Sequence, residues 1–228
     1  MNLFPNARWV FFDVGYTLLD ETRAWQPLLV ALSDELAKVG RPTSVEMIWQ
    51  TYRQICAAFE PRQWIGLCRR LATNDAEFER FNQVALKWDH NLQVPHERAG
   101  DVLRIMSTRY KLGIIANQWV GTAERMKQHG WSDYLSVIIG SAEAGVTKPD
   151  PKIFQMAMQQ AGCTAAEAVM VGDRIDNDIK PAKLLGWGTV HVRQGGSGAQ
   201  APRSPDEEPT AGVAGIADVP KLFGLPLD

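Results

Sequence analysis

Short apolar runs that end at a small or polar residue recur along this chain, and they constrain its fold more than any other feature. Trp9–Phe12 precedes Asp13, and Ala168–Val171 precedes Gly172 and Asp173. Each run is rich in β-branched or aromatic residues and has the length of a buried strand. Three further runs have the same character: Leu112–Ala116, Val137–Ile139 and Thr189–Val192. Stretches with helical spacing separate the later runs, and this alternation predicts a parallel sheet with helices on both faces.

A long stretch without strand-like runs follows the first strand. Between Trp25 and Trp88 apolar residues recur at helical spacing, and Gly40 and Pro42 interrupt the first pattern. The stretch is therefore predicted to be helical, with most of its tryptophans in its own core. We assign residues 20–95 to a helical domain, and residues 1–19 and 96–228 to the domain that contains the sheet. The segment Gln194–Thr210, rich in Gly, Ser, Pro and Glu, is predicted to be an exposed loop.

Composition excludes several classes of protein. Lys and Arg total 24 against 26 Asp and Glu, and no basic stripe predicts nucleic-acid binding. The three cysteines form no CxxC pair, so zinc and redox roles are not indicated. No apolar stretch reaches the roughly 20 residues of a membrane span, and no signal peptide is evident. We expect a cytoplasmic protein that does not bind membranes, either a monomer or a homodimer.

The polar residues that follow the predicted strands carry the chemistry. Ligands bind beyond the carboxyl ends of the strands in an open parallel sheet, so these side chains are expected to meet at one edge. Asp13, Asn117, Lys148 and Asp173 occupy such positions, and Asp150 before Pro151 is instead expected to cap a helix.

The carboxylates of this set suit a hard divalent cation. Oxygen ligands favour Mg²⁺ over zinc and leave room for a phosphate. A carboxylate such as Asp13 can attack phosphorus and form an aspartyl phosphate, while Lys148 neutralises the charges around it. The carboxylates considered as ligands are Asp13, Asp173, Asp176 and Asp178.

Four ordered motifs resemble those of the haloacid dehalogenase (HAD) superfamily. They are Asp13-Val14-Gly15-Tyr16-Thr17, Ala116-Asn117, Thr147-Lys148-Pro149-Asp150, and Gly172-Asp173 through Asn177-Asp178. The resemblance covers most of the chain. It implies a Rossmann-like α/β core, an all-helical cap inserted between the first and second motifs, and Mg²⁺-dependent hydrolysis of a small phosphorylated metabolite.

The resemblance also implies roles for individual residues. Asp13 matches the nucleophile, Thr17 matches the hydroxyl that closes the first motif, and Lys148 matches the lysine that steadies nucleophile and phosphate. The implied Mg²⁺ ligands are Asp13, Asp173, Asp178 and the backbone carbonyl of Gly15. The implied substrate-binding positions are Asn117, Ala116, Gly15 and Tyr16.

Two positions depart from the phosphatases of this superfamily. Gly15 stands where they carry a second Asp that protonates the leaving oxygen, and Ala116 stands where a Ser or Thr usually binds the phosphoryl group. General acid–base help contributes typically about 10² to 10⁴ in rate, so its loss restricts turnover to good leaving groups. Five other residues are candidates for a replacement acid: Asp20, Glu21, Tyr16, His90 and His96.

Two other functions remain open from the sequence. 2-Haloacid dehalogenases of the superfamily also lack the second Asp, because a halide leaves without a proton and no metal is required. In these dehalogenases the nucleophile is usually followed by Tyr and then Gly, whereas this chain has Gly15 and then Tyr16. They also replace the acidic residues of the fourth motif, whereas this chain retains Asp173 and Asp178. The third reading is a non-catalytic protein that binds a ligand or partner.

Overall fold

The computed structural model describes residues 2–225 and residue 227, which form two compact units. The first unit takes the described residues up to Leu19, together with Pro95–Gln194 and those from Ala201 onward. The second unit takes Asp20–Val94 and the separate segment Gly195–Gln200. No helix among the described residues is long and apolar enough to cross a membrane.

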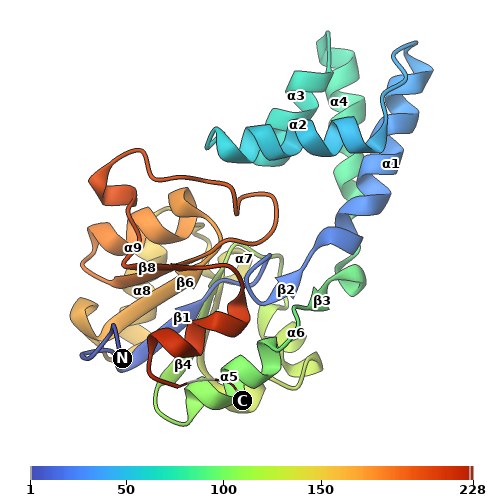
Figure 1. The fold of residues 1–228 in the computed structure, drawn as a ribbon. Coiled ribbons are helices and arrows are strands. Elements are labelled where there is room, and N and C mark those ends of the chain that lie inside the picture. The colour runs from blue at the N-terminus through green and yellow to red at the C-terminus, as the bar shows by residue number, and fades with distance from the viewer. Residues whose placement is uncertain (1, 226, 228) are drawn as a thin grey trace. The chain divides into compact units, whose positions relative to one another are not determined.

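The first unit is built on a parallel sheet with the strand order β5-β4-β1-β6-β7-β8, of which Figure 1 labels β1, β4, β6 and β8. The central strand β1 pairs with β4 on one side and with β6 on the other. The last strand, β8, was not predicted, because it is short and follows the Gly- and Pro-rich segment. The strands are β1 (Trp9–Phe12), β4 (Lys111–Ala116), β5 (Leu135–Gly140), β6 (Ala168–Gly172), β7 (Gly188–Val192) and β8 (Ala211–Val213).

Both faces of this sheet are covered. Val10 and Phe12 of β1 belong to an apolar cluster that includes residues of α5, whereas Phe11 belongs to a second cluster that includes residues of α8. Burial on both faces explains why the strands are continuous apolar runs. The predicted α/β core is therefore confirmed. Its helices are α5 (Ala99–Ser107), α6 (Thr122–Gln128), α7 (Ser141–Ala144), α8 (Pro151–Ala161), α9 (Lys180–Leu184) and α10 (Val219–Leu222).

Shorter turns complete this unit. A π-helical turn, Ile175–Ile179, lies between β6 and α9 and carries two of the carboxylates considered above. The 3₁₀ turns are Ser132–Tyr134, Ala165–Glu167, Pro205–Glu207 and Ile216–Asp218.

The second unit is helical, as its periodicity predicted. It contains α1 (Thr22–Lys38), α2 (Val45–Ala57), α3 (Gln63–Leu71) and α4 (Asp75–Gln83), with 3₁₀ turns at Val84–Lys87 and His90–Leu92. Gly40, at a φ of 76°, follows α1 and allows the left-handed turn that ends it. The backbone N–H of Met47 donates to the Ser44 hydroxyl that caps α2. The short strands β2 (Leu19–Asp20) and β3 (Val94–Pro95) pair where the chain passes between the units.

An aromatic cluster occupies the interior of the helical unit. Trp25 is buried, and its ring centroid lies 4.2 Å from that of Tyr52. Three half-buried tryptophans surround it at centroid distances of 5.8–6.0 Å: Trp49, Trp64 and Trp88. This arrangement agrees with a structural role for most of these side chains.

The segment Gly195–Gln200 departs from the predicted exposed loop. The Gln200 side-chain amide donates to the carbonyl of Cys56 at 2.9 Å, and the Gln63 amide donates to the Ser197 hydroxyl at 3.2 Å. Ser197 and Gln200 are buried. The expectation of an exposed loop was wrong for this segment, because side chains distant in sequence satisfy its polar groups.

Candidate active site

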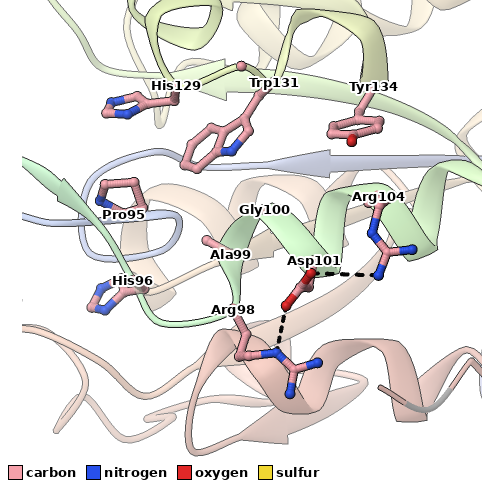
Figure 2. Close-up of a pocket in the computed structure, with 11 residues that line it drawn as sticks. Pro95, His96, Arg98, Ala99, Gly100, Asp101, Arg104, His129, Trp131 and Tyr134 are labelled. Carbon is pink, nitrogen blue, oxygen red and sulfur yellow. Dashed lines mark hydrogen bonds and ion pairs between the residues drawn. The ribbon is translucent and has the colours of Figure 1, made fainter. Parts of the chain in front are cut away.

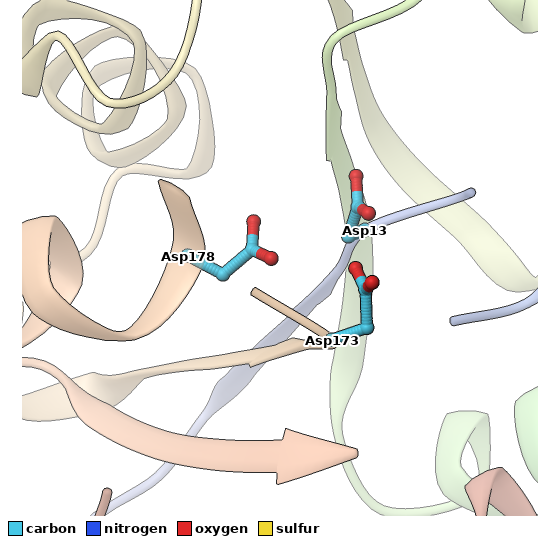
Figure 3. A group of neighbouring side chains, drawn as sticks. All are labelled: Asp13, Asp173 and Asp178. Carbon is cyan, nitrogen blue, oxygen red and sulfur yellow. The ribbon is translucent and has the colours of Figure 1, made fainter. Parts of the chain in front are cut away.

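Three carboxylates come together at the carboxyl ends of the central strands. Asp13 follows β1, and Asp173 follows the neighbouring strand β6. Asp178 lies on the π-helical turn beyond β6. Figure 3 shows the carboxylate of Asp178 directed toward those of Asp13 and Asp173. Carboxylate oxygens of the three residues lie within 4.8 Å of one another, the spacing of a metal-ligand set.

Lys148 connects two of these carboxylates. Its Nζ donates to Asp13 Oδ1 at 2.6 Å and to Asp178 Oδ1 at 2.6 Å. The lysine side chain is only 2% exposed, so both contacts are shielded from water. One ammonium therefore faces three carboxylates in a buried site, and negative charge is in excess.

The excess charge shifts the pKa values of the buried groups. Burial, followed by the charges of Asp13 and Asp178, raises the pKa of Asp173 well above its usual range. Burial also raises the pKa of Asp178 to about 6, with Lys148 opposing the shift and Asp13 adding to it. Burial opposes the charged form of Lys148, but the two carboxylates outweigh it and raise the pKa of this lysine. A further cation at this position would relieve the repulsion among the carboxylates.

Close backbone packing positions Asp178. A Cβ atom on Gly172 would lie 2.4 Å from Asp178 Cγ, so only glycine leaves room for this carboxylate. The backbone N–H of Arg174 donates to Asp178 Oδ2 at 3.0 Å. Asp176, also considered as a ligand, is instead held by the Arg174 guanidinium at 3.1 and 2.6 Å. The structure therefore takes Asp178 into the cluster and leaves Asp176 outside it.

Asn117 positions the lysine through its backbone. The carboxamide of Asn117 accepts from Lys148 N at 2.8 Å and donates to Lys148 O at 2.9 Å. The Lys148–Pro149 peptide bond is cis. Asp150 caps α8 by accepting from Lys152 N at 2.9 Å, as predicted. The side chain predicted to bind substrate thus has a defined positioning contact with the lysine.

The other residues of the first motif line the turn after β1. Thr17 is fully buried, and its hydroxyl has no hydrogen-bond partner among the described residues. Tyr16 is buried and adopts a left-handed backbone conformation, with φ at 51°. Gly15 forms an isolated parallel bridge with Leu19. Ala116 is fully buried at the end of β4.

The residues considered as replacement acids have other structural roles. Asp20 accepts from the backbone N–H of Thr22 at 2.8 Å, and Glu21 accepts from Gln93 at 2.6 Å. Nδ1 of His90 lies 3.2 Å from the Gln93 side-chain oxygen. Within the described residues, the carboxylate cluster that could hold a metal consists of Asp13, Asp173 and Asp178 alone.

His96 lines a separate pocket of about 460 Å³ in the first unit (Figure 2). Asp101 lies between the two arginines of this pocket, 2.7 Å from Arg98 Nε and 3.6 Å from Arg104 Nη2. The Asp101 carboxylate therefore pairs with both guanidinium groups. The residues that line this pocket include none from the four motifs.

Sequence reasoning missed one residue that holds the site in place. The carbonyl of Asp173 lies 3.0 Å from His191 Nε2 on β7. Burial is the largest influence on His191 and lowers its pKa, which favours the neutral ring with Nε2–H donating to that carbonyl. The signal in the sequence was a single ionisable residue inside the apolar run Thr189–Val192.

Comparison with known proteins gives the family of this fold and site. The model of the haloacid dehalogenase-like hydrolase family matches residues 10–192. The chain therefore belongs to the haloacid dehalogenase-like hydrolases, as the four motifs predicted. It is 34% identical over 215 residues to a glyceraldehyde 3-phosphate phosphatase of Methanopyrus kandleri, covering 88% of this chain and 90% of the relative.

Two further similarities complete the comparison. A pyrimidine 5'-nucleotidase of Escherichia coli is 26% identical over 202 residues, which cover 82% of this chain and 88% of that protein. The crystal structure of a 2-haloacid dehalogenase from Pseudomonas syringae superposes with a TM-score of 0.61 at 23% identity, over 96% of this chain and 98% of the other. The last likeness concerns the fold alone, which phosphatases and dehalogenases share.

Proposed function

We propose that this hydrolase releases phosphate from small phosphorylated metabolites through a covalent aspartyl phosphate on Asp13, with Mg²⁺ as cofactor. The observation that carries the proposal is the buried cluster in which Lys148 Nζ lies 2.6 Å from Asp13 while Asp173 and Asp178 complete a set of oxygen ligands. The phosphatase and nucleotidase relatives support phosphate esters as the substrate class.

The donor set fits Mg²⁺. All side-chain ligands are carboxylates, which this ion prefers, and the nearby lysine leaves their negative charge only partly neutralised. Asp13, Asp173 and Asp178 would hold the ion, together with the carbonyl of Gly15. When bound, Mg²⁺ would offset the negative charge of the phosphoryl oxygens. The Thr17 hydroxyl, which lacks a partner within the described part of the chain, is a further buried donor in the first motif.

The side chains of this protein then perform the following steps. A carboxylate oxygen of Asp13 attacks phosphorus, a new P–O bond forms, and the bond to the substrate oxygen breaks. The Lys148 ammonium, 2.6 Å from Asp13 Oδ1, offsets negative charge on the nucleophile and on the phosphoryl group. Water next attacks phosphorus and releases one proton to solvent, the bond to Asp13 breaks, and phosphate leaves with the carboxylate restored.

Gly15 determines which esters react. It supplies no acid for the departing oxygen, which therefore takes its proton from water. Substrates whose alcohols are good leaving groups are therefore expected to have higher turnover rates than simple alkyl esters. The difference in rate can reach about 10²- to 10⁴-fold, which is the typical contribution of a general acid or base.

The proposal also assigns a role to the helical unit. Following the superfamily resemblance, we assign residues 20–95 the role of a cap that selects substrates, and residues 1–19 and 96–228 the role of the catalytic core. Several cationic side chains of the helical unit are already engaged: Arg41 pairs with Glu77, Arg70 pairs with Glu60, and the Arg69 guanidinium lies 4.2 Å from the Phe78 ring centroid. A cytoplasmic location is part of the same proposal.

The decisive experiment is hydrolysis of p-nitrophenyl phosphate with and without Mg²⁺, because this leaving group scarcely requires an acid. We expect Mg²⁺-dependent release of p-nitrophenol that Asp13→Asn abolishes. Asp176→Asn is the matched control, since Asp176 pairs with Arg174 outside the cluster, and it should keep most of the activity. Equal turnover by wild type and Asp13→Asn would overturn the proposal.

The absence of an acid at Gly15 also fits a dehalogenase, which requires none. That function predicts halide release from a 2-haloacid in the presence of chelator and retained activity in Asp173→Ala. The acidic cluster favours the phosphatase, because a halide-releasing site has no use for three carboxylates around a cation position. A non-catalytic binding protein predicts turnover of neither substrate class.

A further inference from the structure

A large apolar side chain is exposed on the sheet-containing unit, in the loop that follows Asn117 of the candidate active site. Trp119 is 70% exposed and Val120 is 72% exposed, two and three residues after Asn117. Isolated exposed apolar residues are common on protein surfaces, so exposure alone indicates nothing. The position of this loop and its rigid backbone are the reasons to assign a function to the exposed indole.

Hydrogen bonds hold nearly every peptide of the loop. The backbone N–H of Gln118 donates to the Ser141 hydroxyl at 3.1 Å, and that of Gly121 donates to Glu143 at 2.7 Å. The Arg125 guanidinium donates to the carbonyl of Trp119 at 2.8 Å and to that of Val120 at 3.0 Å. The indole is thus presented on a fixed backbone, which reduces the ordering entropy lost when a ligand binds.

The same loop forms a pocket. A cavity of about 230 Å³ is lined by Asn117, Gln118, Trp119, Ser141 and Ala142. Asn117 also clasps the backbone of Lys148, whose Nζ contacts the proposed nucleophile. The cavity therefore shares Asn117 with the candidate active site, and both lie in the first unit. An organic group that extended from a phosphate at Asp13 along Asn117 would reach this cavity and its indole.

We propose that Trp119 is a specificity-determining residue whose indole, in the pocket with Asn117, Gln118, Ser141 and Ala142, binds a flat aromatic group of the phosphorylated substrate. The other lining side chains are short or carry amides, so the indole supplies the large apolar surface of the pocket. Stacking on an aromatic ring is favourable beyond the area it buries. This inference rests on the proposed phosphatase function and names the substrate class within it.

The test measures binding without turnover, so it does not depend on catalysis. Affinities of benzylphosphonate, cyclohexylmethylphosphonate and methylphosphonate are determined by calorimetry in the presence of Mg²⁺. We expect wild type to bind benzylphosphonate about tenfold more tightly than methylphosphonate, as aromatic stacking predicts. Trp119→Ala should reduce this ratio to about twofold, and Trp119→Phe should restore most of it.

Leu184→Ala is the control, because Leu184 is a comparably exposed apolar residue on α9, and it should leave the ratio unchanged. The melting temperature of each variant checks its fold. The inference is overturned if the ratio in wild type is near one, if Trp119→Ala leaves it unchanged, or if cyclohexylmethylphosphonate binds as tightly as benzylphosphonate. Loss of the proposed function would appear separately, as absent phosphate release in the p-nitrophenyl phosphate assay.

Discussion

At the scale of single residues, the site depends on how closely Asp178 approaches the backbone after β6. The carboxylate lies against Gly172, and the N–H of Arg174 fixes its second oxygen. Lys148, which donates to the first oxygen of Asp178, is positioned by the two hydrogen bonds between the Asn117 carboxamide and its backbone. Small changes at these supporting positions should therefore disturb the cluster without altering any of the groups that would react.

Gly172→Ala tests this dependence. The added methyl would lie 2.4 Å from Asp178 Cγ, so the turn must shift. Overpacking of this kind costs about 1–3 kcal/mol, and we expect a lower melting temperature together with weaker Mg²⁺ binding. The control is Gly215→Ala, where the nearest neighbour of the new Cβ is Gln194 Oε1 at 3.5 Å. An unchanged Mg²⁺ affinity in Gly172→Ala would contradict the assigned role of Asp178.

The pH dependence of metal binding follows from the raised carboxyl pKa values. In the folded protein burial raises the pKa of Asp178 from its ordinary value of 3.8 to about 6. Between these values the folded state binds more protons than the unfolded state, so the metal-free protein loses stability as pH rises through this window. Mg²⁺ requires the deprotonated carboxylates, so its stabilising effect should grow over the same window and beyond it.

The measurement is the increase in melting temperature on adding Mg²⁺ at pH 5 and at pH 7. We expect a clearly larger increase at pH 7. Asp178→Asn should reduce the increase at both pH values, because it removes one ligand. If Mg²⁺ raised the melting temperature of the wild type equally at both pH values, protons would not be competing with Mg²⁺ for these carboxylates, contrary to this prediction.

At the scale of elements, the segment Gly195–Gln200 lies in the sequence between two parts of the sheet-containing unit, but it packs with α2 and α3 of the helical unit. Its contacts are hydrogen bonds to Cys56 and Gln63 and a close approach of Gly196 to Tyr52. The helical unit is thus completed by residues about 100 positions beyond the end of its main stretch, at Val94.

Gly196→Ala tests the importance of this packing. The new methyl would lie 2.7 Å from Tyr52 Cε1 and 3.3 Å from Cys56 Sγ. We expect the segment to detach from α2, with a cost of about 1–3 kcal/mol and faster cleavage by protease between residues 194 and 204. Ala199→Ser, at an exposed position of the same segment, should leave the cleavage rate unchanged. Equal cleavage of the two variants would contradict this account.

At the scale of the whole molecule, the two units have separate cores. Apolar residues on both faces of the sheet stabilise the first unit, and an aromatic cluster centred on Trp25 stabilises the second. Units with independent cores can open independently.

Trp25→Ala should therefore unfold the helical unit selectively. Removing a large buried aromatic side chain costs about 3–5 kcal/mol, and hydrogen exchange measured by mass spectrometry should show lost protection in α1–α4 with protection in β1, β4 and β6 retained. Trp25→Phe should have a smaller effect, since it retains an aromatic ring. Equal loss of protection throughout both units would show that the molecule unfolds as a single cooperative unit.

Local patterns in the sequence were enough to predict five strands of the parallel sheet, most helices, and the residues that follow those strands. Both faces of each central strand are buried, so the apolar runs are continuous, and the chain leaves the sheet at Asp13, Asn117 and Asp173. The ordered motifs also predicted the family, which the comparison confirmed.

Which polar groups meet depends on packing in three dimensions and could not be predicted from local patterns. Packing placed Lys148 against the Asp178 carboxylate, assigned the Asn117 carboxamide to the backbone of Lys148, and joined Gly195–Gln200 to the helical unit. The physical reason is the same in each case. A buried polar group must find a partner, and the partners here come from segments between 30 and 144 residues apart, whose meeting is determined by packing and not by local sequence.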